Sequence, residues 1–324
     1  MISTVTSVAV IGAGYMGGGI AQSFALAGLP VVIADASAEA TQAAYDRLIR
    51  ESQEFEDAGL YDAGATQTIV ANLRTAPTIE EAVADVDYIE EAVFESLEVK
   101  HDVLARISAA ARPEAIIGSN TSTLPAGDMY TAVSHPERFF TVHFSNPAPF
   151  IPGVEIILSP ASDPALVPVI KDLLIRAGKQ GAVVADVPGF VLNKLQYALM
   201  KEAMTLAENG VASPDDIDTI VRTTFGMRLG FFGPFAIADQ AGLDVWGAGF
   251  DTFEKAYGQR YATPQLIKDA VALDRRGVKN GHGLVRDYSP EQAQAIVAYR
   301  NKAYSEMGRL LAKLGPAPLP QPRD

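Results

Sequence analysis

The sequence predicts an α/β fold in which a doubly wound, mostly parallel sheet is followed by an all-α C-terminal domain. Short β-branched runs alternate with stretches of helical length between residues 6 and 184, which is the pattern of βαβ units. These runs stop near Pro188, and helical stretches broken by Pro and Gly follow. A chain of 324 residues is long enough for about two domains, each able to bury its own core. We therefore expect domains at residues 1–186 and 187–324.

The expected strands are short, apolar and rich in Val and Ile. In chain order they cover Ser7–Ile11, Val31–Ala34, Tyr88–Glu90, Ile116–Gly118, Phe139–Val142, Val154–Leu158 and Ala182–Val184. Helices fill the gaps between them, and residues 97–110 are amphipathic. The buried face predicted for this helix consists of Val99, Val103, Leu104 and Ile107. Lys100 is expected on another face.

The composition excludes several classes of function. The chain has 26 basic and 39 acidic residues, a net charge of −13 and no basic run, so we expect no nucleic-acid partner. No stretch approaches the ~20 apolar residues that cross a bilayer, and no signal segment is visible. We therefore expect a soluble, cytoplasmic protein without a membrane partner. The absence of Cys excludes disulfides, thiolate nucleophiles and Cys-ligated metals, and no metal site is expected.

A glycine-rich turn follows the first expected strand directly. Gly12, Gly14 and Gly17 form a G-x-G-x-x-G pattern, with Tyr15 and Met16 before the third glycine. Gly12 permits the tight turn, Gly14 lets the backbone approach a pyrophosphate, and Gly17 allows close packing of helix on strand. The N-terminus of the next helix supplies N–H groups for the phosphates. This pattern is typical of a Rossmann-type nucleotide-binding domain.

Asp35 indicates which nucleotide this turn binds. It ends the second expected strand, 18 residues after Gly17, where a carboxylate accepts hydrogen bonds from the ribose hydroxyls. Because this carboxylate would repel a 2′-phosphate and no Arg follows it, NAD is favoured over NADP. In the alternative interpretation, the glycines serve packing only and Asp35 caps the next helix.

A histidine and a glutamate form the candidate catalytic pair. His143 is expected at the C-terminal end of a strand, the sheet edge at which open α/β sheets bind ligands. Glu155 lies in an otherwise apolar strand, where a carboxylate needs a partner. A carboxylate on one ring nitrogen fixes the tautomer and favours proton removal by the other. The alternative is a structural His143 bonded to a backbone carbonyl.

With these features in place, nearly the whole sequence resembles the NAD-dependent L-3-hydroxyacyl-CoA dehydrogenases and their short-chain relatives. The motifs that carry the resemblance are the glycine turn, Glu91–Lys100, Ser119–Ser122, His143–Pro147, Val154–Glu155, Pro188–Asn193 and Gly233–Phe235. The resemblance implies that His143 is the general base and Glu155 its orienting carboxylate. It also implies that Ser122 and Asn193 hydrogen-bond the substrate oxygen. The alternatives are a helix cap for Ser122 and a helix cap or bridge for Asn193.

The same resemblance implies further cofactor residues and an assembly. Glu95, Lys100, Asn146 and Lys279 would lie around the cofactor, and the helical domain would form a homodimer. Surface ion pairs are the alternative for Glu95, Lys100 and Lys279.

Other features favour a free acid over an acyl-CoA as substrate. The segment 47–62 is acidic where the acyl-CoA enzymes offer basic residues to the CoA phosphates. The loop 149–153 is similar to that of relatives acting on free hydroxy acids, such as L-gulonate and L-carnitine dehydrogenases. Arg228 could clamp a carboxylate, or else form a surface or intersubunit ion pair. The aromatic residues expected to ring such a pocket are Phe144, Phe150, Phe231 and Phe232.

Four interpretations of function therefore stay open at this point. The favoured one is a dehydrogenase that oxidises a small hydroxy acid, or reduces the corresponding keto acid, with NAD. A true L-3-hydroxyacyl-CoA dehydrogenase and a dehydrogenase for an aromatic aldehyde or hydroxymethyl acid are the enzymatic alternatives. A non-catalytic, crystallin-like NAD-binding protein is the alternative from another class, and the presence of all four candidate catalytic residues favours an enzyme.

Overall fold

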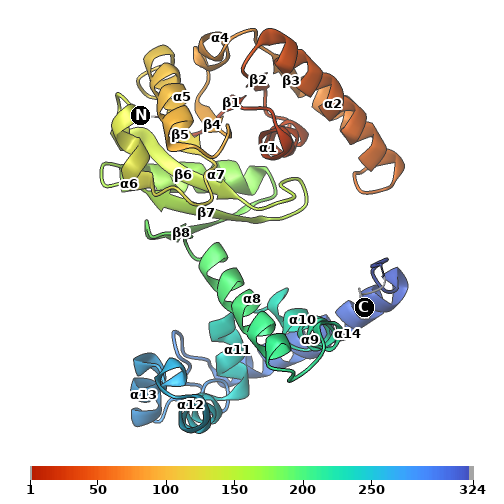
Figure 1. Ribbon diagram of the computed structural model, residues 1–324, viewed down its shortest axis with the longest axis vertical. Helices are drawn as coiled ribbons and strands as arrows, with labels where there is room; N and C mark the ends of the chain where they lie inside the picture. The colour runs from red at the N-terminus through yellow and green to blue at the C-terminus, as the bar shows by residue number, and fades with distance from the viewer. Residues whose placement is uncertain (1, 321–324) are drawn as a thin grey trace. The chain divides into compact units, whose positions relative to one another are not determined.

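The computed structural model describes residues 2–320. The described chain forms two compact units that divide after Met200, called unit 1 and unit 2 (Figure 1). The division falls within a helix, 14 residues after the expected domain boundary at residue 186. The domain boundary expected at residue 186 stays a prediction.

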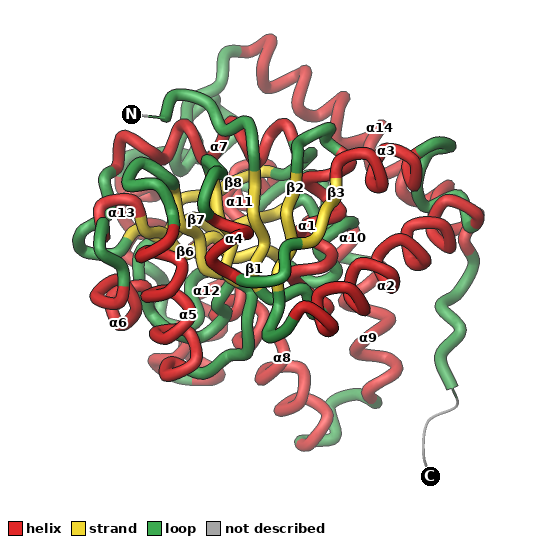
Figure 2. Tube along the Cα trace, turned by 90° about the horizontal axis from the view of Figure 1, so that it is seen from above, coloured by secondary structure: helices red, strands yellow, loops and turns green. Residues whose placement is uncertain are grey.

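Unit 1 is built on one eight-stranded sheet with the order β3-β2-β1-β4-β5-β6-β7-β8 (yellow in Figure 2). The strands are β1 (Val8–Ile11), β2 (Val31–Ala34), β3 (Leu73–Thr75), β4 (Tyr88–Glu91), β5 (Ile116–Ser119), β6 (Phe139–Phe144), β7 (Gly153–Leu158) and β8 (Gln180–Val184). All neighbouring pairs are parallel except β6 and β7. The predicted doubly wound sheet is therefore confirmed, and β3 is the strand that the sequence analysis missed.

Helices cover both faces of this sheet. They are α1 (Tyr15–Leu26), α2 (Ala38–Asp57), α3 (Ala65–Asn72), α4 (Ile79–Val83), α5 (Leu97–Ala110), α6 (Ala126–Met129) and α7 (Val167–Arg176), with short 3-10 turns at Tyr130–Ala132, Pro136–Arg138 and Pro164–Leu166. Apolar side chains of α1, α2, α3 and α7 share one core with the first face, and those of α4, α5 and α6 share another with the second face. The strand order reverses between β1 and β4, and such a point is where open α/β sheets bind ligands.

The predicted buried face of α5 was partly wrong. Val103, Leu104 and Ile107 are buried as expected, but Val99 is 40% exposed and Lys100 is fully buried. The buried face is therefore rotated toward Lys100. An ammonium can occupy it because carboxylates from neighbouring segments surround it, and the hydrophobic pattern of the helix alone does not reveal those partners.

The described chain after β8 is helical, as predicted. Its helices are α8 (Leu192–Glu208), α9 (Pro214–Thr223), α10 (Phe225–Leu229), α11 (Pro234–Ala241), α12 (Leu243–Tyr257), α13 (Gln265–Ala272) and α14 (Pro290–Leu314), with a 3-10 turn at Gln259–Tyr261. A small core in unit 2 forms around Leu243, which is fully buried. Buried side chains of α11 and α13 pack with it. Within residues 2–320, no helix has both the length and the apolar character needed to cross a membrane.

Candidate active site

The glycine turn has the backbone geometry that its sequence predicts. Gly12 has a φ of +90°, which disfavours any residue with a side chain. A Cβ on Gly17 would lie 1.8 Å from the carbonyl oxygen of Gly12, so only glycine permits this approach of α1 to β1. Gly14 precedes α1 without a side-chain cap, and no atom lies within 4 Å of the position a Cβ would take. Because no side chain caps α1, its first N–H groups remain available to bind a phosphate.

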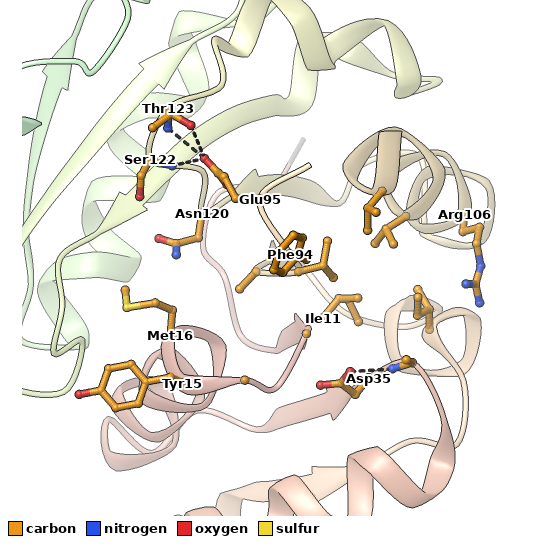
Figure 3. Close-up of a pocket in the computed structure, with 18 residues that line it drawn as sticks. Ile11, Tyr15, Met16, Asp35, Phe94, Glu95, Arg106, Asn120, Ser122 and Thr123 are labelled. Atoms are coloured by element: carbon orange, nitrogen blue, oxygen red, sulfur yellow. Dashed lines mark hydrogen bonds between the residues drawn. The ribbon is translucent and has the colours of Figure 1, made fainter. Parts of the chain in front are cut away.

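A pocket of about 700 Å³ follows the carboxyl ends of β1, β2, β4 and β5. It runs from Asp35 past Tyr15 and Met16 to Ser122 (Figure 3). The Asp35 carboxylate accepts a hydrogen bond from the N–H of Ala13 at 2.8 Å, which ties it to the glycine turn. A pocket lined by a glycine turn at a helix N-terminus and by a carboxylate at the end of the second strand matches the polarity of NAD.

Sequence reasoning missed several residues around this pocket. Phe94 lines it and is 80% exposed, and Arg106 lines it while paired with Glu80 at 2.8 Å. Arg47 donates to the carbonyl oxygen of Ala13 at 2.7 Å. Phe94 lies next to Glu95 within a motif that the sequence analysis singled out, so its position was available as a signal. Arg47 lies 34 residues from Ala13, and no local pattern connects them.

His143 and Glu155 lie directly opposite each other in the antiparallel pair of β6 and β7. The Nδ1 atom of His143 is 2.9 Å from Oε2 of Glu155, and both side chains are almost fully buried. The other carboxylate oxygen, Oε1, accepts the N–H groups of Val191 and Leu192, each at 2.9 Å. Three hydrogen bonds thus hold the carboxylate, one of them to the ring, and Nε2 on the other side of the ring stays available.

Ser122 connects this buried pair to the pocket. Its Oγ lies 3.1 Å from Nε2 of His143, and Ser122 also lines the pocket. With the proton of His143 on Nδ1, facing Glu155, Nε2 accepts the hydrogen bond of the hydroxyl. Asn193 donates from Nδ2 to the carbonyl oxygen of Ser122 at 3.1 Å. The structure therefore brings together all four residues that the sequence analysis assigned to catalysis.

Glu95 holds the segment that carries Ser122. Its Oε1 accepts hydrogen bonds from the N–H groups of Ser122 and Thr123 at 3.0 Å each and from the hydroxyl of Thr123 at 2.9 Å (Figure 3). It also accepts a hydrogen bond from the hydroxyl of Thr121 at 2.6 Å. Partial burial by itself would raise the pKa of the Glu95 carboxyl. The hydrogen bond from Thr121 and the charge of Lys100 outweigh burial and hold that pKa below its usual value.

Lys100 lies behind Glu95 and does not line the pocket. Its Nζ is 2.8 Å from Oε1 of Glu91, 3.6 Å from Oε2 of Glu95 and 3.5 Å from the carbonyl oxygen of Val93. Oε2 of Glu91 accepts the hydroxyl of Ser119 in turn. The alternative of a surface ion pair is wrong for Lys100, because the ammonium is fully buried.

The remaining residues assigned to the cofactor lie outside this network. Asn146 is exposed just beyond β6 and precedes Pro147 through a cis peptide bond. Lys279 belongs to unit 2 and pairs with Asp244 at 3.1 Å, and this hydrogen bond lowers the pKa of the Asp244 carboxyl. The assignment of both residues to the cofactor stays a prediction. Within residues 2–320, no group of three His, Asp or Glu side chains is arranged to hold a metal ion.

Arg228 lines a separate pocket in unit 2. This pocket of about 370 Å³ is also lined by Gln240, Arg300, Asn301 and Tyr304. Arg300 donates from Nε and Nη2 to Oδ1 of Asn301, and within the described residues neither arginine is within ion-pair distance of a carboxylate. Two guanidinium groups without acidic partners make this pocket electropositive. Arg300 was not singled out from the sequence, because it lies in an amphipathic helix with no motif around it.

The expected aromatic ring around a substrate pocket was wrong for Phe144 and stays a prediction for Phe150. Phe144 is 1% exposed and packs edge-on against Phe24 in the core below α1. Phe150 packs against Phe55 and Tyr61 beside α2. The side chain of Phe144 alternates with that of His143 along β6, so the two must point to opposite faces of the sheet.

In unit 2, Phe231 and Phe232 pack against aromatic residues of α14. Both contact Tyr304, and Phe232 also contacts Tyr299.

Comparisons with known proteins show the family of this chain. The family model described as "3-hydroxyacyl-CoA dehydrogenase, NAD binding domain" matches residues 7–187, and the model described as "3-hydroxyacyl-CoA dehydrogenase, C-terminal domain" matches residues 189–287. The 5-formyl-3-hydroxy-2-methylpyridine 4-carboxylate 5-dehydrogenase of Mesorhizobium japonicum is 33% identical over 95% of this chain and 98% of its own length. The L-carnitine dehydrogenase of Pseudomonas putida is 36% identical over 92% of this chain and 90% of its own length.

A solved structure is similar to this chain over nearly its whole length. The 3-hydroxyacyl-CoA dehydrogenase of Archaeoglobus fulgidus superposes with a TM-score of 0.79 at 29% identity, covering 95% of this chain and 99% of that one.

Proposed function

Because this chain belongs to the 3-hydroxyacyl-CoA dehydrogenase family and is an NAD-dependent oxidoreductase acting on hydroxyl groups, we propose that it oxidises a small free hydroxy acid, with His143 as the general base. The observation that carries this proposal is the contact chain from Glu155 through His143 to Ser122 at the end of the nucleotide pocket. The reverse reaction, reduction of the keto acid, uses the same groups with the proton returned.

The cofactor residues of this proposal are those of the glycine turn and the pocket. Gly12, Gly14, Tyr15, Met16 and Gly17 would receive the pyrophosphate. Asp35 would accept the ribose hydroxyls, and Asn146 and Lys279 would lie near the rest of the cofactor. Bound NAD supplies the acceptor for the hydride that leaves the carbinol carbon.

The protein groups handle the proton and the developing carbonyl. His143 removes the hydroxyl proton through Nε2, and Glu155 stabilises the positive charge that the ring acquires, since its carboxylate faces Nδ1 at 2.9 Å. Positioned general-base help of this kind is worth roughly 10²–10⁴ in rate. With substrate bound, the single hydroxyl proton of Ser122 would turn from Nε2 to the substrate oxygen, which leaves Nε2 free to take the substrate proton. Ser122 and Asn193 would then donate hydrogen bonds to the oxygen as the C=O bond forms, and the loss of one such donor costs about 3 kcal/mol of barrier.

The cations of unit 1 around residues 47–50 and 179 support a substrate without CoA. Arg47 donates to the glycine turn and lies 3.5 Å from Glu51, while Arg50 lies 4.0 Å from Glu54. The buried ammonium of Lys179 donates to the carbonyl oxygens of the loop 148–151. Every one of these cations already has a partner, so a polyanionic CoA handle gains little from them.

The pocket of unit 2 supports a carboxylate on the substrate. Arg228 is the residue that we propose to bind this carboxylate, because a guanidinium binds it in a bidentate manner. A second candidate, an aromatic aldehyde or hydroxymethyl acid, is favoured by the similarity to the pyridine-carboxylate dehydrogenase. Both candidates share the carboxylate and differ in the group that is oxidised.

A substrate panel tests this proposal. NADH oxidation is followed with purified protein and free 3-keto acids, aromatic aldehyde acids or acetoacetyl-CoA. We expect kcat/KM to be highest for a free acid and to fall about 100-fold, or ~2.7 kcal/mol, in Arg228→Met. The matched control Arg222→Met removes an exposed arginine one helix away and should leave activity unchanged. Efficient acetoacetyl-CoA reduction that survives Arg228→Met would overturn the free-acid proposal and favour a true acyl-CoA dehydrogenase.

A direct mutation tests the base. His143→Ala should abolish turnover while NADH still binds. Normal turnover in this variant would refute the assignment, and NADH binding without turnover of any compound by the wild type would favour the non-catalytic interpretation. We further propose a homodimer, which the exposed apolar residues of α8 support, and a cytoplasmic location, which stays a prediction from the sequence.

A further inference from the structure

The loop between β6 and β7 is held by a buried cation. We propose that Lys179 is a positioning residue, whose ammonium fixes the turn 147–151 and with it Asn146, the residue that precedes the turn. This inference rests on the proposed function, because the position of Asn146 matters for catalysis only if Asn146 lies at the cofactor. Lys179 itself lies outside every motif of the sequence.

The turn 147–151 leaves carbonyl oxygens that need donors. The carbonyl oxygen of Pro147 accepts the N–H groups of Phe150 and Ile151, each at 3.1 Å, so the segment forms one helix-like turn. The carbonyl oxygens that follow in a single turn have no partner within it. Ala148 is 2% exposed, and a buried carbonyl group without a donor is costly.

Lys179 supplies the missing donors. Its Nζ donates to the carbonyl oxygen of Ala148, to that of Pro149 at 3.3 Å and to that of Ile151 at 3.1 Å. An ammonium has three N–H groups, so these three acceptors use all of them. One atom therefore fixes the carbonyl groups of most of the turn.

The charge of Lys179 depends on the same contacts. The residue is 4% exposed, and among the described residues no carboxylate lies within ion-pair distance of its Nζ. Burial lowers the pKa of this ammonium from its usual value, and no neighbouring charge opposes that effect. A buried cation without a counterion needs oriented dipoles in place of water, and the three carbonyl groups provide them.

The turn also contacts the helix that follows the glycine turn. A Cβ on Gly19 of α1 would lie 2.8 Å from Cδ of Pro149 and 3.3 Å from Cβ of Ala148. The turn is therefore packed on α1, whose N-terminus would receive the pyrophosphate in the proposed function. Because Lys179 fixes the turn against this helix, it also fixes Asn146 relative to the cofactor.

The first test reads the position of Asn146 in the full chain. With ¹⁵N-asparagine labelling, the backbone amide resonance of Asn146 is assigned by its loss in Asn146→Ala. We expect Lys179→Met, which keeps most of the side-chain length and removes all three donors, to move this resonance. The matched control Lys171→Met removes a partly exposed lysine of α7 and should leave the resonance unchanged.

A double-mutant cycle on NADH affinity separates positioning from a general loss of structure. We expect the Kd for NADH to rise about tenfold in Asn146→Ala and about fivefold in Lys179→Met. The double variant should bind NADH no more weakly than Asn146→Ala alone, because Lys179 acts through Asn146. A lysine that only stabilises the fold would give independent effects, which multiply to about 50-fold.

Lys179→Arg keeps the test decisive if Lys179→Met fails to fold. Arginine keeps the charge but carries its donors beyond the position of Nζ, so the turn must shift to meet them. We expect a smaller shift of the Asn146 resonance and a rise of about twofold in the Kd for NADH, again absent when residue 146 is Ala.

Two results would overturn the inference. One is an Asn146 resonance that stays at its wild-type position in the Lys179 variants. The other is a set of Kd values in which the effects of Lys179 and Asn146 multiply. If Asn146→Ala binds NADH as wild type does, the proposed cofactor role of Asn146 fails, and the resonance still decides whether Lys179 positions Asn146.

Discussion

Glu155 is the residue on which the proposed chemistry depends most directly. It makes three contacts, one to the ring of His143 and two to backbone N–H groups at the start of α8. The backbone bonds explain why a carboxylate is stable in this nearly buried position. The contact to Nδ1 leaves Nε2 as the only ring nitrogen able to take a proton from a substrate.

Replacing this carboxylate with an amide separates the two roles. Glu155→Gln can still accept the N–H groups of Val191 and Leu192, but it carries no charge to stabilise a protonated His143. We expect kcat to fall about 100-fold, with the Kd for NADH within about twofold of wild type, measured by NADH absorbance and fluorescence titration. The control Glu137→Gln alters an exposed His–Glu pair with His135 at 3.5 Å and should behave as wild type. An unchanged kcat in Glu155→Gln would contradict the assignment.

Asp35 allows a second prediction at the same scale. Asp35→Asn keeps the shape of the side chain and removes the charge that accepts the ribose hydroxyls. We expect the Kd for NADH to rise about tenfold, or ~1.4 kcal/mol, and the preference over NADPH to shrink because the repulsion of a 2′-phosphate is lost. Asp46→Asn on the exposed side of α2 is the matched control. Equal NADH affinity in Asp35→Asn and wild type would show that Asp35 only orders the turn through Ala13.

Single residues also show the limit of sequence reasoning. The pairing of His143 with Glu155 was predictable, because one carboxylate in an apolar strand needs a partner. The positions of Arg47 and Lys100 were not. Each contacts a segment outside its own helix. Arg47 contacts the glycine turn, and Lys100 contacts the end of β4. Such contacts depend on the folded sheet and leave no periodic signal.

At the scale of the element, β4 places two adjacent carboxyl groups on opposite faces of the sheet. Glu91 faces Lys100, whereas Glu90 is buried on the other face beside Tyr88, and its Oε1 has no hydrogen-bond partner. A Cβ on Gly118 would lie 2.4 Å from the hydroxyl of Tyr88, so the neighbouring strand must carry glycine there. Burial raises the pKa of the Glu90 carboxyl well above its usual range.

This pKa shift predicts a stability that depends on pH. The folded state keeps the Glu90 proton in a range above pH 4.5 in which the unfolded state has lost it, so the free energy of unfolding falls as pH rises through that range. The loss amounts to at most about 1.4 kcal/mol per pH unit. Glu90→Gln has no such proton and should gain stability relative to wild type between pH 5 and 8, as measured by urea midpoints. Parallel pH profiles for wild type and Glu90→Gln would contradict a neutral Glu90, and Glu98→Gln should run parallel to wild type.

At the scale of the whole molecule, the order of elements was more predictable than their pairing. The alternation of apolar runs and helices in residues 6–184 specified a doubly wound sheet, and the end of the β-branched runs specified the helical part. The short strand β3 has a single buried residue, Leu73, and so lacked a hydrophobic run to reveal it. The antiparallel pairing of β6 with β7 was equally hidden, because both strands are apolar on their buried faces whichever way they run.

The exposed surface of α8 supports the proposed homodimer and allows its test. Tyr197, Met200 and Met204 lie at helical spacing on one stripe of α8 and are at least half exposed, which is costly for residues of this size unless a partner covers them. In a two-fold symmetric pair the same stripe contributes from both copies, so one substitution acts twice.

We therefore expect the protein to sediment at twice the 34.4 kDa mass of one chain and Met200→Asp to sediment as a monomer. Ala198→Asp adds the same charge to an exposed position on the opposite side of α8 and should stay dimeric. A monomeric wild type, or variants that assemble alike, would show that a second copy does not cover this stripe.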